Sequence, residues 1–403
     1  MQNPQTVLPP ITERSGILRW LRHNLFNTWS DAILTVIAAS LIYWLTKNLL
    51  TWAVTTAEWD VVVANLRLFM IGQFPLEQAG RLWVALAFLV FLTGNSLAIW
   101  DRKSYIAAFL ILGLPVFLIF LPFAPQTRIW LGVMAAAGIL GWGLGYTAPQ
   151  SVKRSVAIGW LIALPVFILL TRGFTPAVAD VPNTPITIVP TNLWGGLLLT
   201  FLLTVVANIF SFPLGLLLAL GRRSELPIIR WFSVGYIELV RGVPLITILF
   251  MAQLMLPLFL PNGQDIDRVL RAMVGMTLFS AAYLAENVRG GLQAIPKGQF
   301  EAAHALGLSS AKTMYFIILP QALRLIIPIL VGQFISMFKD TALVAIVGLF
   351  DLLGIARTVL SQPEFIGLHR EVYAFVSLFY WGLSYVMSYI SQRLETSLGL
   401  GTR

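Results

Sequence analysis

Long apolar runs with few charged residues constrain this chain more than any other feature of its sequence. Charged residues make up 11% of the 403 residues, where a soluble domain averages about 25%. Several runs reach the ~20 residues that an α-helix needs to cross a bilayer. The short alternating segments of a membrane β-barrel do not occur. We therefore expect an all-α polytopic membrane protein, since backbone polar groups inside a bilayer must be satisfied within the fold.

Ten segments are predicted as transmembrane helices. They are residues 31–53, 82–100, 104–123, 129–147, 155–170, 194–220, 242–261, 269–288, 322–347 and 373–393. The segment 54–81 has two interpretations, an amphipathic helix on the external surface or an eleventh, imperfect span. Arg67 in its centre argues against a full crossing, because a charge in the bilayer core is costly.

The distribution of Lys and Arg predicts the orientation. Placing both termini in the cytoplasm puts most of these residues in or beside cytoplasmic segments, as the positive-inside rule requires. This also accounts for the net charge of +9 without a nucleic-acid partner. No basic stretch is interleaved with the aromatic residues on which bases stack, so we expect no nucleic acid to bind.

A polar segment divides the chain. Residues 171–192 are rich in Pro and Thr, which is typical of a linker, and the predicted orientation makes this linker external. We therefore predict two regions. Residues 1–190 form an N-terminal membrane region of about five spans, with few charges and no motif that carries chemistry. Residues 191–403 hold five more spans, and their connecting segments carry the remaining motifs.

The segment 301–320, EAAHALGLSSAKTMYFIILP, is charged and rich in small residues, and it lies between apolar spans. Pro296 suits a helix start, where its missing N–H is not needed. Gly307 suits a helix end that requires positive φ. Ser309 or Ser310 is predicted to cap a second short helix, and Pro320 lies in the first turn of the next span. We expect a cytoplasmic helix, a break at Gly307, and a second helix that enters the membrane.

This segment resembles the EAA loop of ABC import permeases. The matching residues are Glu301, Ala302, Ala303, Gly307, Ile317, Leu319 and Pro320. Three further segments resemble the polar amino acid branch of the family: YIELVRGVPLITILF at 236–250, AYLAENVRGGLQAIPKGQFEAAHALGLS at 282–309, and FKDTAL at 338–343. The front 190 residues are similar in architecture to the long permeases of the general L-amino-acid type. The resemblance implies a five-helix permease core in residues 191–403.

The resemblance also implies partners and a role. ABC ATPase subunits would dock on the EAA segment through Glu301, Ala302, Ala303 and Gly307. A second permease subunit, a related hetero-partner, and an external solute-binding protein complete the expected importer of amino acids in the bacterial inner (plasma) membrane. ATP is used by the partner ATPase, and this chain is expected to bind no cofactor and to be no enzyme. It contains no G-x-x-x-x-G-K-[ST] phosphate loop.

Two acid–base pairs near predicted cytoplasmic span ends are candidate pathway residues. Glu238 and Arg241 are three residues apart, as are Glu286 and Arg289, so each pair shares a helix face. One interpretation is a local ion pair that lowers the cost of charge near lipid. The other is a gate network or a substrate contact at the inner mouth.

Lys339 and Asp340 interrupt an apolar run, QFISMFKDTALVAIVGLF, and are further pathway candidates. Adjacent helical residues point about 100° apart, so we do not expect the two to pair with each other. A break in the helix near Lys339 would let both face a central cavity. A structural role remains open.

Other features favour packing over chemistry. The glycine string GWGLGY at 141–146 lacks the order of a phosphate loop and predicts close helix packing. The three histidines are scattered and cysteine is absent, so no metal site is predicted. A secondary transporter driven by an ion gradient is the alternative function, but it would show matched repeats and acidic mid-span residues. A membrane enzyme would need a nucleophile or metal constellation, and none is visible.

Overall fold

The computed structural model describes residues 17–100, 109, 113–120, 123–147, 149–176, 184, 186–259, 261 and 266–397. Within these ranges the regular secondary structure is helical, and β-structure is limited to three isolated bridges. The chain divides into two units, Met1–Asp60 and Val61–Arg403. The fold class predicted from the sequence is confirmed.

The first unit contains a short and a long helix. Helix α1 spans Ile17–Leu25, and α2 spans Trp29–Thr51 and continues as a π-helical turn over Trp52–Thr56. Thr28 caps α2 by accepting a hydrogen bond from the Asp31 N–H, and the Asp31 carboxylate accepts one from the Thr28 N–H in return. Helix α2 has no buried residue.

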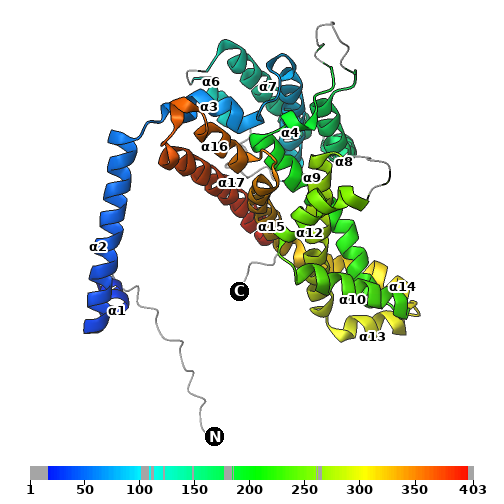
Figure 1. Cartoon of the computed structure of the whole chain (residues 1–403). Helices are drawn as coiled ribbons and strands as arrows, with labels where there is room; N and C mark the ends of the chain where they lie inside the picture. Colours follow the sequence, from blue (N-terminus) through cyan, green and yellow to red (C-terminus); the bar gives the residue numbers. More distant parts are fainter. Residues whose placement is uncertain are drawn as a thin grey trace. The chain divides into compact units, whose positions relative to one another are not determined.

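The second unit begins with helices that precede residue 190 and are drawn in blue to green in Figure 1. They are α3 (Asp60–Ile71), α4 (Gly80–Trp100), α6 (Leu114–Ile119), α7 (Pro125–Thr147) and α8 (Pro149–Arg172). Helix α4 packs along α7 and also contacts α8. Two glycines of the GWGLGY string, Gly141 and Gly145, make this approach possible. A Cβ on Gly141 would lie 2.2 Å from the Phe91 carbonyl oxygen, and one on Gly145 would lie 2.8 Å from that of Asn95. The predicted packing role is confirmed.

The helices after residue 190 form the rest of the unit. The long ones are α9 (Gly196–Gly221), α10 (Pro227–Arg241), α12 (Arg268–Gln293), α15 (Leu319–Asp340) and α17 (His369–Ser397). The short ones are α11 (Leu245–Phe250), α13 (Lys297–Ala305), α14 (Ser310–Thr313) and α16 (Leu352–Leu360). Helix α9 packs along α12, and α15 contacts both α12 and α17. Figure 1 shows α13 and α14 together at one end of this arrangement.

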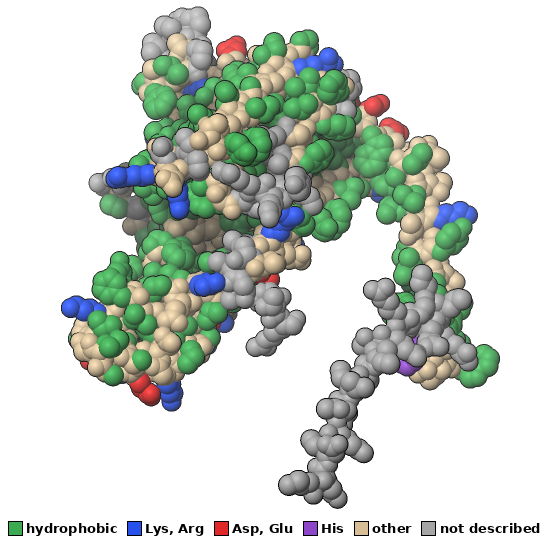
Figure 2. Space-filling model, turned by 180° about the vertical axis from the view of Figure 1, so that it is seen from behind, with side chains coloured by type: hydrophobic (Ala, Val, Ile, Leu, Met, Phe, Trp, Pro, Cys, Tyr) green, Lys and Arg blue, Asp and Glu red, His purple; other side chains and the backbone are tan. Residues whose placement is uncertain are grey.

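Seven helices among the described residues are long and apolar enough to cross a membrane, and an eighth span results if one bent pair is counted. The seven are Trp29–Thr56, Leu76–Trp100, Pro125–Thr147, Val152–Arg172, Gly196–Gly221, Arg268–Gln293 and Ser310–Val347. Many large apolar side chains on these helices are exposed, as lipid contact requires. Figure 2 shows such side chains over much of one face.

The predicted count of ten spans is not confirmed. Most of the expected span 104–123 lies outside the described residues, apart from α6. The expected span 242–261 is part of the bent pair, Pro227–Arg241 with Leu245–Phe259, which turns by 105°. Helix α17 has 29 residues and is long enough to cross a membrane. Its frequent Tyr and Ser residues lower its hydropathy, so it is not among the seven candidate spans. Within 54–81, α3 has 12 residues, or about 18 Å of rise, which is too short for a crossing.

Apolar packing continues across residue 190. One buried cluster joins Phe74 and Leu82 from the front region to Leu199, Met276 and Leu349 from the later region. Separate roles for residues 1–190 and 191–403 therefore stay a prediction. A second cluster, which includes Ile237, Val288 and Ile318, lies at the end of the unit near α13.

Candidate functional site: a surface helix and a charge cluster

Helix α13 has the architecture predicted for the 301–320 segment. Pro296 is its N-cap residue. At its C-terminus Gly307 has φ +78°, and its N–H donates to the His304 carbonyl while the Leu308 N–H donates to that of Ala303. These two bonds form a Schellman motif, which satisfies carbonyls that the helix end leaves free. Ser309 is the N-cap residue of α14, although its side chain makes no capping hydrogen bond, and Pro320 lies in the first turn of α15.

The four predicted coupling residues differ in exposure. Glu301, Ala302 and Gly307 are exposed, whereas Ala303 is only 4% exposed. Ala303 therefore packs inward, and the docking role predicted for these four residues stays a prediction. Leu306 is 82% exposed and was not among the predicted coupling residues. Its signal was an apolar residue directly before the helix-ending glycine. The surface of α13 and its C-terminal turn thus offers the Glu301 carboxylate, small side chains and the apolar Leu306, beside the polar side chains of Lys297, Gln299 and His304.

Two side-chain contacts attach α13 to the C-terminal end of α9 and to the first turn of α15. Phe300 packs against the apolar cluster near α13, and the Arg223 guanidinium lies over its ring at 5.9 Å from the centroid. The Gln321 amide donates to the Gln299 side chain at 3.2 Å. Since Arg223 directly follows the α9 C-cap, α13 is in contact with the end of a long helix.

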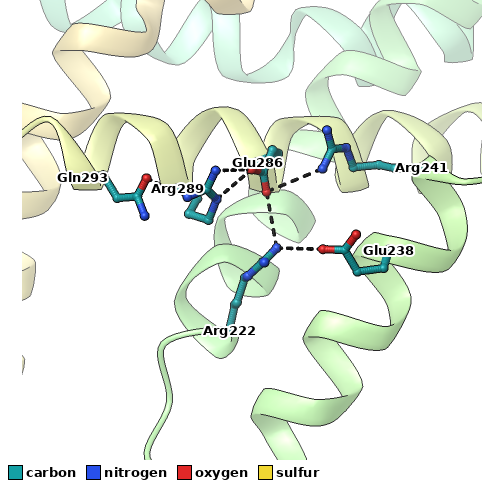
Figure 3. A network of polar contacts seen from close by, with 6 residues as sticks. All are labelled: Arg222, Glu238, Arg241, Glu286, Arg289 and Gln293. Carbon is teal, nitrogen blue, oxygen red and sulfur yellow. Dashed lines mark hydrogen bonds and ion pairs between the residues drawn. The ribbon is translucent and has the colours of Figure 1, made fainter.

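A charge cluster joins the ends of three helices, α9, α10 and α12 (Figure 3). Arg222 Nη1 lies 3.3 Å from Glu238 Oε1 and 3.4 Å from Glu286 Oε2. Arg241 Nη1 lies 3.7 Å from the same Glu286 oxygen. Arg289 donates from Nε to Glu286 Oε1 at 2.7 Å. Glu286 is therefore the shared acceptor of three arginines.

The predicted local pairs are half right. Glu286 and Arg289 form a pair within α12, as their spacing suggested. Glu238 and Arg241 instead reach away from each other, toward Arg222 and Glu286 respectively. Arg222, the C-cap residue of α9, belongs to the cluster but was not among the predicted pathway residues. Its sequence signal was the pair of arginines directly after a predicted span, Arg222 and Arg223.

The cluster is partly exposed and carries an excess of positive charge. Three arginines face two glutamates, and the Glu286 side chain is 21% exposed while that of Glu238 is 57% exposed. Single exposed ion pairs contribute little to stability because water screens them. A shared acceptor holds several side chains in one geometry, so the cluster fixes the relative positions of three helix ends. Arg241 also lies 5.6 Å from the ring centroid of Tyr283.

Lys339 and Asp340 lie apart from this cluster in the contact network. Helix α15 ends at Asp340 and continues as a 3-10 turn over Thr341–Val347, so the predicted break lies one residue from Lys339. Lys339 is exposed and Asp340 is half-buried. Within the described part of the chain neither forms an ion pair. Their role in substrate passage stays a prediction.

The described residues hold no group of three His, Asp or Glu side chains that could bind a metal ion. Polar groups do meet between α12 and α15. The Asn287 amide donates to the Gln333 side chain at 3.0 Å, and the Gln333 amide donates to the Ser280 hydroxyl at 2.6 Å. The contacts at these two places are therefore ion pairs and amide hydrogen bonds.

Comparison with known proteins identifies the family. Residues 211–399 match the family described as binding-protein-dependent transport system inner membrane component. The chain is 39% identical over 399 residues to the inner membrane amino-acid ABC transporter permease protein YhdY of Escherichia coli K12, covering 98% of this chain and 96% of that relative. The chain belongs to the amino-acid ABC transporter permeases. It is thus a multi-pass inner-membrane protein of the long form.

Other members of this permease family show the same relation. The glutamate/glutamine/aspartate/asparagine transport system permease protein BztC of Rhodobacter capsulatus is 38% identical over 427 residues, covering 97% of this chain and 95% of the relative. The probable glutamine ABC transporter permease protein GlnP of Bacillus subtilis is 34% identical over 203 residues, covering 50% of this chain and 92% of the relative. A permease of the short form therefore matches half of this one.

Proposed function

We propose that this permease forms the translocation path of an ATP-driven amino-acid importer and receives its energy from a separate ATPase at α13. The observation that carries the proposal is the exposed surface of α13, with Glu301, Ala302 and Leu306, on a chain that has no phosphate loop of its own. The ATPase subunits bind this surface from the cytoplasm. Both termini of the chain lie on the cytoplasmic side of the membrane.

The charge cluster supports a mechanism. Arg223 links α13 to the end of α9, and the neighbouring Arg222 links α9 to Glu238 and Glu286. A displacement of α13 by the ATPase therefore changes the geometry of the cluster. In this mechanism the cluster acts as a gate near the inner mouth, which opens and closes as the helices move.

The cargo and the remaining partners follow from the relatives. Their names assign them amino acids, and we propose amino acids as the cargo here. A second, related permease subunit completes the path, and an external solute-binding protein delivers the substrate. Uptake competition with the twenty amino acids identifies the cargo.

Two α13 variants test the coupling. Gly307→Pro cannot adopt φ +78° and loses the N–H that donates to His304, so the end of α13 is displaced. Glu301→Lys reverses the exposed charge. We expect both to insert in the membrane and to lose ATP-driven uptake of radiolabelled amino acid by at least about tenfold.

Gly298→Ala is the matched control, because this glycine also lies in α13 and a Cβ there meets nothing within 4 Å. It should transport at the wild-type rate. Wild-type uptake by both Gly307→Pro and Glu301→Lys would refute coupling through α13. Co-purification of the wild-type chain with a phosphate-loop ATPase is the accompanying measurement.

A further inference from the structure

A cavity of about 450 Å³ lies where four segments of the second unit meet. The segments are the end of α8, the stretch that leads into α9, the start of α12 and the turn after the 3-10 helix Thr341–Val347. The side chains that matter for its chemistry are Arg172, Thr191, Asn192, Trp194, Asp267 and Arg268. Its volume is in the range of sites that hold small molecules.

The lining carries a surplus of positive charge. Arg172 and Arg268 come from two different helices, and Asp267 is the one acidic residue among the described lining residues. The Asp267 carboxylate is already engaged. One oxygen accepts the N–H groups of Val269 and Leu270, and the other accepts the Thr191 hydroxyl. Within the described ranges neither arginine forms an ion pair, so both guanidinium groups are available to a ligand.

Trp194 provides a second, independent observation. Its side chain lines the cavity and the residue is only 4% exposed. Its indole N–H is buried and has no acceptor among the described residues. A buried donor without a partner is destabilising, because it has lost its hydrogen bonds to water. A ligand oxygen in the cavity would supply the acceptor, and the neighbouring Asn192 amide adds another donor.

The position of the cavity relates it to transport. Arg268 begins α12, and α13 follows the C-terminal end of this 26-residue helix. The cavity therefore lies at the end of α12 opposite the proposed ATPase surface. Arg172 and Trp194 precede residue 211, where the match to the permease family begins, whereas Arg268 follows it. The front region and the core build this cavity jointly.

We propose that the cavity binds a small solute that carries a carboxylate, with an acidic amino acid as the type case. Two guanidinium groups are planar forks of donors that match carboxylate oxygens. The amide of Asn192 and the indole N–H of Trp194 hold the remaining oxygens. This binding site goes beyond the proposed translocation and coupling function, and its location on the outer face rests on the proposed orientation.

Isothermal titration calorimetry of the purified full chain in phosphatidylcholine nanodiscs tests the site, with L-glutamate as the probe. We expect saturable binding to the wild-type chain. Arg172→Gln and Arg268→Gln should each weaken binding by at least about tenfold, the loss expected for a charge-assisted hydrogen bond. Arg128→Gln is the matched control, because Arg128 is exposed and does not line the cavity. It should bind as the wild type does.

A cooperative thermal unfolding transition for each variant shows that it is folded. Trp194→Phe is a further, independent variant, because it keeps an aromatic ring but removes the N–H. It should also bind L-glutamate more weakly than the wild type. Absence of saturable heat in the wild type overturns the proposal, as does unchanged binding by both arginine variants. Equal affinity for inorganic phosphate would make the cavity a general anion site and overturn the carboxylate assignment.

The lipid headgroup is a separate source of anionic oxygens. Repeating the titration in phosphatidylglycerol nanodiscs should leave the affinity for L-glutamate unchanged. Loss of binding there would assign the arginines to lipid and overturn the proposal. The measurement needs neither ATPase nor binding protein, so its failure would leave the proposed transport function standing, and a failure of ATP-driven uptake would leave this site standing.

Discussion

At the scale of single residues, Glu286 makes the most ion pairs in the charge cluster. It accepts from Arg222, Arg241 and Arg289, which come from three helices. The sequence spacing predicted its pair with Arg289, because residues three apart share a helix face. The spacing did not predict that Arg222 contacts Glu286, or that Arg241 pairs with Glu286 instead of Glu238. Those contacts depend on how α9 and α10 approach α12, which no local spacing encodes.

Glu286→Gln should lower both stability and transport. Glutamine keeps an acceptor oxygen but removes the charge that three arginines share, at a cost of about 1–3 kcal/mol. We expect the temperature of thermal unfolding in nanodiscs to fall by several degrees and uptake to fall with it. Glu238→Gln is the matched control, since its side chain is 57% exposed and pairs with Arg222. An equal or larger effect of Glu238→Gln would contradict the central position of Glu286.

Lys339→Ala and Asp340→Ala test the other pathway candidates. The helix changes from α to 3-10 directly after Asp340. Both residues lie within the candidate span Ser310–Val347, and ionisable residues inside a membrane span are functional candidates. We expect each variant to assemble normally and to transport with a lower maximal rate or a changed concentration dependence. Unchanged transport over the full range of substrate concentration would make both residues structural.

At the scale of elements, small residues and prolines decide how the helices meet. The GWGLGY string indicated close packing, and the structure locates it between α4 and α7. The bend between α10 and α11 was less apparent from hydropathy, which continues through 242–261. Its local signal was Pro244, the N-cap of α11, because the residue before a proline is steered away from helical geometry. The 105° angle itself depends on packing against α12.

Gly141→Ala should loosen the contact of α4 with α7. The new Cβ would lie 2.2 Å from the Phe91 carbonyl oxygen, which is backbone and must shift. Overpacking of this kind costs about 1–3 kcal/mol, and we expect a lower unfolding temperature.

Gly143→Ala is the control within the same string, because a Cβ there meets nothing within 4 Å. It should leave the unfolding temperature unchanged or raise it slightly, since alanine favours helix. Equal destabilisation by both variants would show that helix propensity, rather than the α4–α7 contact, dominates.

At the scale of the whole second unit, three glycines bring distant backbones together. Gly72 at the end of α3 lies against Gly195, and Gly196 lies against the Phe69 carbonyl. Beside them Phe69 packs on Phe375 of α17, and the Gln362 amide donates to Asn65 at 3.1 Å. The linker composition predicted a break in organisation near residue 190, yet it could not show that α3 packs beyond it. Such long-range contacts leave no periodic pattern in the sequence.

Gly196→Ala should destabilise the unit more than an ordinary glycine replacement. The residue has φ +60°, and a Cβ would lie 2.3 Å from the Phe69 carbonyl oxygen. Gly367→Ala is the control that separates strain from space, because its φ is +101° with nothing within 4 Å. We expect the larger fall in unfolding temperature for Gly196→Ala. Equal falls would mean that backbone strain alone accounts for both.

The contacts of α3 also have a consequence for biogenesis. The Asn65 and Gln362 partners are 297 residues apart in the chain. At ribosomal rates of about 5–20 residues per second, this separation amounts to on the order of tens of seconds between their syntheses. Helix α3 therefore leaves the ribosome long before its packing surface exists. A chain that terminates before α16 would lack both Gln362 and Phe375, the side-chain partners of Asn65 and Phe69.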